Sequence, residues 1–427
     1  MISSVATPEV KKSNRFGLAS LARKAVMSQL RQLHSGCIVL VEGASSTLFG
    51  QPLTRGDDLY AELVVHDPGC FVDIMTAGSI GAAESYMTGD WSTPDLTMLI
   101  RVMVRNRDIL DQMEGGIAAI SRPLLKLFHR LNQNNEKGSR RNIAAHYDLG
   151  NDLFQLFLDP TMMYSSGIFP QKNATMHDAS TTKLRRICEK LQLSENDHLL
   201  EVGTGWGGLA IFAAKNYGCQ VTTTTISEQQ YQLAKSRVAE AGLEHKITLL
   251  KEDYRNLSGT YDKLVSIEMI EAVGWQFYQT FFEKCSSLLK PSGVMLIQAI
   301  TIEDQRYEQA KRNVDFIQRY IFPGSCIPSI QALITASMHG SNMRLVQLED
   351  FAEHYASTLH AWKKQFNHNL PKVKELGYSE EFQRMWNFYL SYCEGGFKER
   401  SIGVAHMLFA KPLFRGEQVV LSADTVV

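Results

Sequence analysis

The sequence predicts an α/β fold built on a doubly wound parallel sheet. The first observation is an apolar strand, a glycine-rich turn and a helical segment in succession, in HLLEVGTGWGGL at residues 198–209. The second is the alternation of strand-like and helical segments that continues to residue 300, which is typical of parallel sheets. The third is the length of 427 residues, which is sufficient for two or three domains.

We expect three parts in chain order: a small α+β accessory domain at residues 1–110, a linker at 111–140, and the main α/β domain at 141–427. Residues 1–35 contain six basic residues and one acidic residue. The helical spacing of apolar residues over 16–33 fits a helix on an anionic membrane surface, or equally a helix that packs on its own domain.

The accessory domain combines apolar runs with helical patterns. Residues 37–43, 58–67 and 70–75 are strand-like, whereas 78–91 is helical and 96–110 is an amphipathic helix. The linker that follows is polar and basic, which is typical of a solvated segment; the alternative is a segment that docks to anionic lipid headgroups.

The main domain begins with helices at 142–157 and 181–193 around an irregular loop. The alternating segments are strands at 198–203, 220–225, 247–250, 261–267 and 294–300, and helices at 208–216, 228–241 and 275–289. Residues 302–342 interrupt this pattern, and insertions of that length are commonly lids or substrate walls. A strand at 345–348, helices at 349–376 and 379–397, and a strand at 402–410 complete the prediction.

The glycine-rich turn predicts a nucleotide-type pocket. Gly203, Gly205 and Gly207 allow positive φ and close approach of a ligand, and the helix behind them directs free N–H groups into the turn. A dinucleotide site would also have an acid about 20 residues further on, but here the acid is Glu201, inside the first strand. This arrangement favours a cationic ligand such as S-adenosylmethionine (SAM); the alternative is a tight turn with a solvated glutamate.

Polar residues follow the next two strands. Ser227 and Gln230 have the spacing of a helix capping box, while Thr225 and Gln230 are also candidate hydrogen-bond partners of a ribose. Asp253, after the third strand, is either a partner of an adenine amino group or an ordinary loop carboxylate.

Two acids, Glu268 and Glu271, follow the fourth strand, at the edge where open α/β sheets bind their ligands. Glu271 has apolar neighbours in sequence. We therefore expect desolvation to raise the pKa of its carboxyl group, and we expect it to have partners or a proton-handling task.

Composition excludes several classes of protein. The 44 basic and 45 acidic residues exclude a generally basic nucleic-acid binder, and no apolar run approaches the length of a membrane span. The first residues lack a signal-peptide pattern. The seven cysteines are scattered without a CxxC pair, which indicates reduced thiols and neither a disulfide framework nor a metal site.

The motifs in residues 140–411 together resemble the cyclopropane-fatty-acyl-phospholipid synthase family and its mycolic acid cyclopropane synthase relatives. They are HYDLGNDLF (146–154), DPTMMYSS (159–166), LLEVGTGWGGLA (199–210), TTISEQQ (224–230), DYRNL (253–257), SIEMIEAVG (266–274), LKPSG (289–293), RYIFPG (319–324), HYASTLHAW (354–362) and YLSYCEGGF (389–397). In addition, GAAESYMTGDW at 81–91 is similar to the accessory domain of the phospholipid-acting branch.

The resemblance implies a Rossmann-like class I methyltransferase with a helical insertion or lid, which uses SAM to form cyclopropane rings at cis double bonds of phospholipid acyl chains. It implies a bound bicarbonate as the base, held by Ser166, Glu271, Gln298, Ile300 and Tyr355. The implied cofactor contacts are Tyr164, Ser165, Gly203, Gly205, Thr225, Ile226, Gln230 and Asp253. Cys393 matches a cysteine often described as catalytic, but the reaction needs no covalent intermediate with the enzyme, so a buried apolar thiol is the better interpretation.

The sequence departs from the family pattern at Ser166, Ala272 and Gln298, where cysteine, histidine and histidine are usual. The amide of Gln298 can donate a hydrogen bond, but it cannot take up a proton and become charged. Three functions are thus expected as alternatives. The first is an enzyme that forms cyclopropane rings, and the second is an enzyme that methylates the acyl chain without closing a ring. The third is a lipid-binding protein without turnover. We also expect a cytoplasmic protein peripherally bound to the inner face of the membrane, a possible homodimer, and no nucleic-acid partner.

Overall fold

The computed structural model describes residues 15–51, 59–115, 134, 138, 139, 142 and 149–416. Contacts divide the chain into two compact units, residues 1–123 and 124–427. We call them the amino-terminal unit and the main unit and describe each separately. Within the described ranges, no helix is long and apolar enough to cross a membrane.

The amino-terminal unit is an α+β structure with a four-stranded sheet in the order β2-β1-β3-β4. β1 pairs antiparallel with β2 and parallel with β3. The strands are β1 (Gly36–Glu42), β2 (Ser45–Gln51), β3 (Tyr60–Val65) and β4 (Trp91–Ser92), and the helices are α1 (Arg15–Leu30), α2 (Gly69–Met87), α3 (Leu96–Arg105) and α4 (Arg107–Gly115).

Two predictions for this unit are wrong. Residues 70–75 begin helix α2, because a short apolar run does not distinguish a strand from a buried helical turn. The helix expected at 96–110 is divided at Asn106, whose buried side chain accepts from the backbone N–H groups of His34 and Ser35. Helix α4 then continues to Gly115, so the predicted linker begins as a helix.

Helix α1 packs on its own unit. Ala22, Val26 and Leu30 are buried, and Arg23 forms an ion pair with Glu42 of β1 at 2.5 Å. For residues 15–30 the structure thus agrees with the packed-helix alternative; residues 1–14 lie outside the described ranges.

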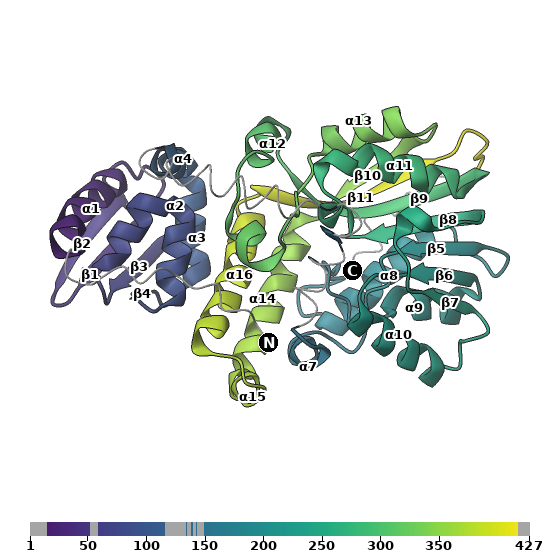
Figure 1. Cartoon of the computed structure of the whole chain (residues 1–427), viewed down its shortest axis with the longest axis horizontal. Helices are drawn as coiled ribbons and strands as arrows, with labels where there is room; N and C mark the ends of the chain where they lie inside the picture. The colour runs from purple at the N-terminus through teal and green to yellow at the C-terminus, as the bar shows by residue number, and fades with distance from the viewer. Residues whose placement is uncertain are drawn as a thin grey trace. The chain divides into compact units, whose positions relative to one another are not determined.

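The main unit contains a seven-stranded sheet in the order β10-β11-β9-β8-β5-β6-β7 (Figure 1). The strands are β5 (His198–Val202), β6 (Gln220–Thr224), β7 (Ile247–Leu250), β8 (Tyr261–Ile267), β9 (Leu289–Ile302), β10 (Arg344–Asp350) and β11 (Ile402–Ala410). The doubly wound α/β fold is confirmed, with one correction: β11 runs antiparallel to β9 and β10. Apolar periodicity identifies a strand but carries no information on its direction.

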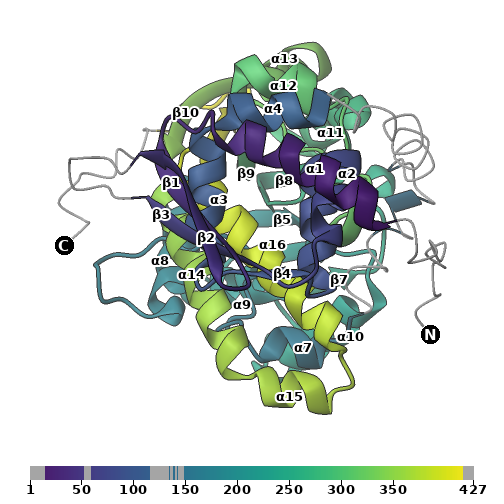
Figure 2. The same cartoon turned by 90° about the vertical axis from the view of Figure 1, so that its left-hand side faces the viewer.

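Helices α8, α9 and α10 cover one face of this sheet, and α11 and α13 cover the other. The α-helices described in this unit are α7 (Asn151–Gln155), α8 (Met176–Lys190), α9 (Gly208–Tyr217), α10 (Glu228–Glu240), α11 (Tyr278–Ser287), α12 (Asp304–Ala310), α13 (Ile330–Gly340), α14 (Ala352–His368), α15 (Leu370–Glu375) and α16 (Glu380–Lys398). The expected helix at 349–376 is two helices, because β10 extends to Asp350 and a break at Asn369 precedes Pro371. Figures 1 and 2 show α14 and α16 side by side.

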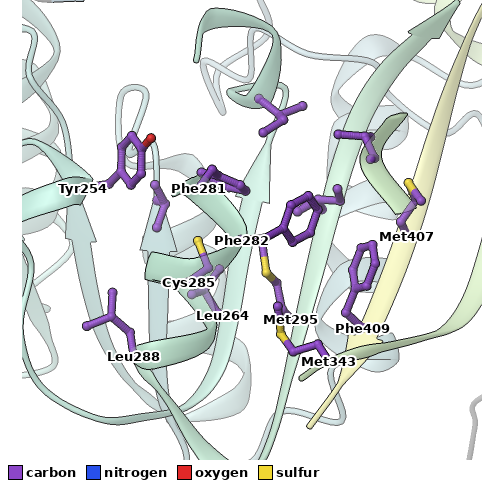
Figure 3. Packing of buried hydrophobic residues seen from close by; sticks show 14 of the residues in the cluster. Tyr254, Leu264, Phe281, Phe282, Cys285, Leu288, Met295, Met343, Met407 and Phe409 are labelled. Atoms are coloured by element: carbon purple, nitrogen blue, oxygen red, sulfur yellow. The ribbon is translucent and has the colours of Figure 1, made fainter. Parts of the chain in front are cut away.

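Successive residues of a strand point to opposite faces of the sheet and pack in two separate hydrophobic cores. Leu199 of β5 packs with α8, α9 and α10, whereas Leu200 faces the cluster formed by α11 and α13, as the alternation of strand side chains requires. In the second cluster, Phe282 and Cys285 of α11 pack over Met295 and Phe409 of the sheet (Figure 3). These cores hold the carboxyl ends of the parallel strands in a fixed position.

Part of the predicted linker belongs to the main unit. Asn134 is buried and donates from Nδ2 to the carbonyl of Gly324 at 2.7 Å. Ser139 is also buried and donates to the carbonyl of Asn134. The polar composition of this stretch is therefore used in internal hydrogen bonds at these residues, rather than in solvation.

Candidate active site

A cavity of about 260 Å³ lies at the carboxyl ends of the parallel strands. Its polar wall comes from the ends of β5, β6 and β7 and includes Gly203, Gln230 and Asp253. Its apolar wall comes from the 302–342 insertion and from α14 and α16, with Ile317, Phe322, Leu359 and Phe397 among its members. One cavity thus joins a polar, nucleotide-type end to an apolar end.

The glycine turn forms the floor of the polar end. Gly203, Gly205 and Gly207 have φ values of 104°, 52° and 84°, in the region that favours glycine. At Gly208 a Cβ would lie 2.7 Å from the carbonyl oxygen of Thr161, so no larger residue fits without movement. Gly203 and Gly205 line the cavity, whereas Gly207 is not in its wall and serves the turn itself.

Glu201 is buried in β5 and is not the solvated glutamate of the alternative interpretation. Burial raises the pKa of its carboxyl group to about 8, although a hydrogen bond from Thr223 Oγ1 at 2.6 Å and the charge of Lys183 oppose this shift. Lys183 is also buried and donates to Ser165 Oγ at 2.7 Å. Burial lowers the pKa of Lys183 to about 8 against the charges of Glu268, Asp159 and Glu201.

The polar residues after β6 form a small hydrogen-bonded group. Thr225 Oγ1 donates to Gln230 Oε1 at 2.9 Å, and the backbone N–H of Gln230 donates to Ser227 Oγ at 3.3 Å. The N-cap bond of Ser227 is thus present, but the Gln230 side chain bonds Thr225 instead of completing a capping box. Thr225, Ile226 and Gln230 all line the cavity.

Asp253 lies in the cavity wall after β7, and its carboxylate is buried. Arg255 binds it through Nε to Oδ1 at 2.8 Å and through Nη2 to Oδ2 at 2.9 Å. Asp253 is thus neither a solvated loop carboxylate nor a free one: its charge is already balanced by Arg255.

Glu268 also lines the cavity, and its carboxylate accepts three hydrogen bonds. The backbone N–H of Ser166 and Gln298 Nε2 donate to Oε1 at 2.9 and 2.7 Å. The hydroxyl of Tyr355 donates to Oε2 at 2.6 Å. Three of the five residues that the resemblance assigned to a bicarbonate therefore come together around a carboxylate of the chain itself. The Ser166 hydroxyl donates elsewhere, to the carbonyl of Gly167.

Glu271 lies one turn further along and is differently bonded. The backbone N–H of Ile300 donates to Oε1 at 2.5 Å, while Oε2 is buried without a hydrogen-bond partner among the described residues. Burial raises the pKa of Glu271 to about 8, and the nearby charge of Glu268 adds to this rise. The prediction of a desolvated Glu271 with a raised pKa is confirmed.

Two further predicted residues lie in the wall toward α16. Tyr164 and Tyr389 share a hydrogen bond between their hydroxyl oxygens at 2.9 Å. Cys393 also lines the cavity. Burial raises the pKa of its thiol, so the thiol stays protonated, in agreement with a packing role rather than a nucleophilic one.

The prediction of site residues omitted Glu268 and Lys183. Glu268 was detectable, since it ends a predicted strand beside Glu271, but its three donors come from distant segments. Lys183 had no signal, because it lies on the polar-looking helix α8 and is buried only through tertiary packing.

Comparisons with known proteins agree with this geometry. The family model described as "Mycolic acid cyclopropane synthetase" matches residues 134–407. The tuberculostearic acid methyltransferase UfaA1 of Mycobacterium tuberculosis is 35% identical over 94% of this chain and 95% of its own length. The cyclopropane-fatty-acyl-phospholipid synthase of Escherichia coli K12 is 34% identical over 84% of this chain and 90% of its own length.

Solved structures give the same result. The mycolic acid cyclopropane synthase CmaA1 complexed with SAH and CTAB has 31% identity and a TM-score of 0.60, covering 64% of this chain and 98% of that chain. The cyclopropane synthase MmaA2 of Mycobacterium tuberculosis has 28% identity and the same TM-score and coverage. The family predicted from the motifs is confirmed: the chain belongs to the mycolic acid cyclopropane synthetase family of SAM-dependent methyltransferases.

Proposed function

We propose that this protein transfers the methyl group of SAM to the cis double bond of an unsaturated acyl chain in a membrane phospholipid and closes a cyclopropane ring. The observation that carries the proposal is that a glycine turn and an apolar wall line one and the same cavity. A hydrophilic substrate would have no use for such a wall.

The polar end of the cavity suits SAM. Gly203, Gly205, Thr225, Gln230 and Asp253 all line the cavity. In our proposal the two glycines allow close approach of the amino-acid part, Thr225 and Gln230 bind the ribose, and Asp253 is the partner of the adenine. When bound, SAM supplies an electrophilic methyl group on a positively charged sulfur. The CmaA1 relative was solved with SAH, the form of the cofactor that remains after methyl transfer.

The apolar end suits an acyl chain. Methylation of an alkene generates a carbocation, which water would capture, so the reaction requires a dry site. Ile317, Phe322 and Leu359 supply apolar surface, and the ring of Tyr355 stacks on Phe397 with centroids 4.4 Å apart. Aromatic faces stabilise a nearby cation. CTAB in the CmaA1 structure is itself a long-chain amphiphile.

The test uses the full chain, methyl-labelled SAM and vesicles of phospholipid with monounsaturated acyl chains. We expect label in the lipid fraction and an upfield ring-methylene signal in the proton NMR spectrum of the product. Vesicles with fully saturated chains are the control, because they offer no double bond. Label in both vesicle types, or in neither, would contradict the proposal.

A second product has its own support. The relative that aligns over 95% of its length is named for tuberculostearic acid methylation, and Gln298 cannot take up a proton. Loss of a proton from a chain carbon rather than from the new methyl group would give a methylated acyl chain without a ring. Both products gain one CH₂, so mass does not separate them; the absence of the ring-methylene signal from a labelled lipid would identify the open-chain product.

The setting of the reaction follows from its substrate. We propose that the protein is cytoplasmic, binds peripherally to the inner face of the membrane, and dimerises through the accessory domain predicted at residues 1–110. Co-sedimentation with anionic vesicles and sedimentation velocity, each on the full chain and on a chain lacking residues 1–110, test the two interactions.

A further inference from the structure

Three separate segments of the chain donate hydrogen bonds to the carboxylate of Glu268. Ser166 precedes α8, Gln298 lies on β9 and Tyr355 lies on α14, and their donor atoms are 2.6 to 2.9 Å from the carboxylate. Three donors favour the ionised form of a carboxyl group. The same carboxylate forms part of the cavity wall, so it is both held in place and accessible to a bound molecule.

The donor end of Gln298 is set by residues behind it. Lys190 Nζ lies 3.3 Å from His406 Nδ1. An ammonium group can only donate a hydrogen bond, so His406 Nδ1 is the acceptor. His406 therefore carries its proton on Nε2 and donates to Gln298 Oε1 at 2.9 Å. Burial lowers the pKa of His406, which keeps the ring neutral. The amide NH₂ of Gln298 is consequently the end that faces Glu268.

The backbone at Glu268 is in an unfavourable conformation. Its φ is 47°, in the left-handed region that non-glycine residues seldom adopt. The backbone N–H of Glu268 donates to the carbonyl of Gln298 at 2.7 Å, which holds this geometry at the end of β8. Such strain is tolerated mainly where a site requires it, and here it directs the carboxylate toward Tyr355 and Gln298.

We propose that Glu268 is the resident base of the reaction, and that turnover requires no dissolved base. This inference rests on the proposed function. The π electrons of the alkene form the new C–C bond while the C–S bond breaks, and sulfur keeps that electron pair. The carbocation then loses a proton to the Glu268 carboxylate. The electron pair of the broken C–H bond closes the ring, or forms a double bond in the open-chain product, and the carboxylic acid later releases its proton to solvent.

The neighbouring charges fit this role. Burial raises the pKa of Glu271 to about 8, so Glu271 is largely protonated at neutral pH, whereas the three donors to Glu268 favour its ionised form. Burial raises the pKa of Glu268, and the hydrogen bonds from Tyr355, Ser166 and Gln298 together with the charge of Lys183 oppose this rise. A negative charge beside the cavity also stabilises a cation that forms there.

The test compares Glu268→Gln and Glu268→Gly with the matched control Glu375→Gln, which changes an exposed glutamate on α15. Glu268→Gly suits the backbone, because glycine adopts a φ of 47° without strain. We expect both Glu268 variants to lose about 100-fold or more in methyl transfer to lipid, as for removal of a general base. SAM binding by titration calorimetry should stay within threefold of that of the wild type.

We further expect millimolar formate or bicarbonate to raise the activity of Glu268→Gly at least tenfold over its activity without the anion, since either anion can take the place of the missing carboxylate. The wild type should be equally active in CO₂-free buffer. Activity of Glu268→Gln within threefold of the wild type, dependence of the wild type on added bicarbonate, or no rescue of Glu268→Gly would overturn the inference. A wild type that labels no lipid would instead overturn the proposed function.

Discussion

His406 Nε2 lies 2.9 Å from Gln298 Oε1, and this hydrogen bond determines which end of the Gln298 amide faces Glu268. His406 is on β11, and Gln298 is its cross-strand partner on β9. A residue that is not itself in the cavity wall, on an antiparallel strand, thus orients a donor to Glu268. We call His406 a positioning residue, because it acts on the site through Gln298.

Replacement of His406 by phenylalanine should lower kcat about tenfold, which corresponds to the loss of one hydrogen bond of about 1.4 kcal/mol. The affinity for SAM should change less than twofold, since the polar end of the cavity is untouched. Steady-state kinetics with vesicle substrate and calorimetry measure the two quantities. An equal loss in kcat and in SAM affinity would contradict the positioning role and point to a general loss of structure.

The pH dependence of turnover should report on Glu268. Burial raises the pKa of its carboxyl group above the ordinary value of 4.5, while Tyr355, Ser166, Gln298 and Lys183 oppose the rise. A base must be ionised, so kcat should fall as the pH drops through this raised pKa. Tyr355→Phe removes a bond to the charged form, and the acid limb should therefore move to higher pH. A shift to lower pH in Tyr355→Phe would contradict this assignment.

The pairing of α14 with α16 should depend on pH through Glu394. Burial alone would raise the pKa of this carboxyl group, but Lys363 and Lys398, at 2.6 and 2.7 Å, lower it to about 2. Because the folded-state pKa is depressed, this stabilisation is present above pH 4.5 and is lost as the pH falls from 4.5 toward 2.

Glu394→Gln should therefore reduce the free energy of unfolding by about 3 kcal/mol at pH 7 and have little effect near pH 2. Urea denaturation at several pH values measures this difference. Glu353→Gln is the control: its ion pair with Arg400 is 3.6 Å long and largely exposed, so the expected change is below about 0.5 kcal/mol. Equal effects of the two substitutions would contradict the prediction.

Gly208→Ala should weaken SAM binding more than tenfold. The added Cβ would meet the carbonyl oxygen of Thr161 and the sulfur of Met163, each at 2.7 Å, and their displacement would distort the turn that precedes α9. Gly377→Ala is the control. Gly377 has a φ of 91°, so alanine there brings backbone strain of about 1 kcal/mol, but the added Cβ meets no atom within 4 Å and the residue is not in the cavity wall. Equal loss of SAM affinity in both variants would show that the effect is one of stability.

Local patterns in the sequence predicted most of the fold. The strand, glycine turn and helix at residues 198–209 form as expected, and strand–helix alternation identified the α/β class, because periodicity and turn chemistry depend on neighbouring residues. The family was also predictable, since its motifs are short. The errors fall where local pattern is ambiguous: the apolar run at 70–75, the helix break at Asn106, and the direction of β11.

The environment of Glu268 was decided by tertiary structure alone. Ser166 is 102 positions from Glu268 in the chain, Tyr355 is 87 positions away, and His406 is 108 positions from Gln298. The sequence by itself determined which acids stand at the end of β8, that the side chain of Gln298 cannot take up a proton, and that the turn after β5 is rich in glycine. Which acid receives the three donors depends on how β9, β11 and α14 pack, because a hydrogen bond between distant segments exists only once the sheet and its helices have assembled.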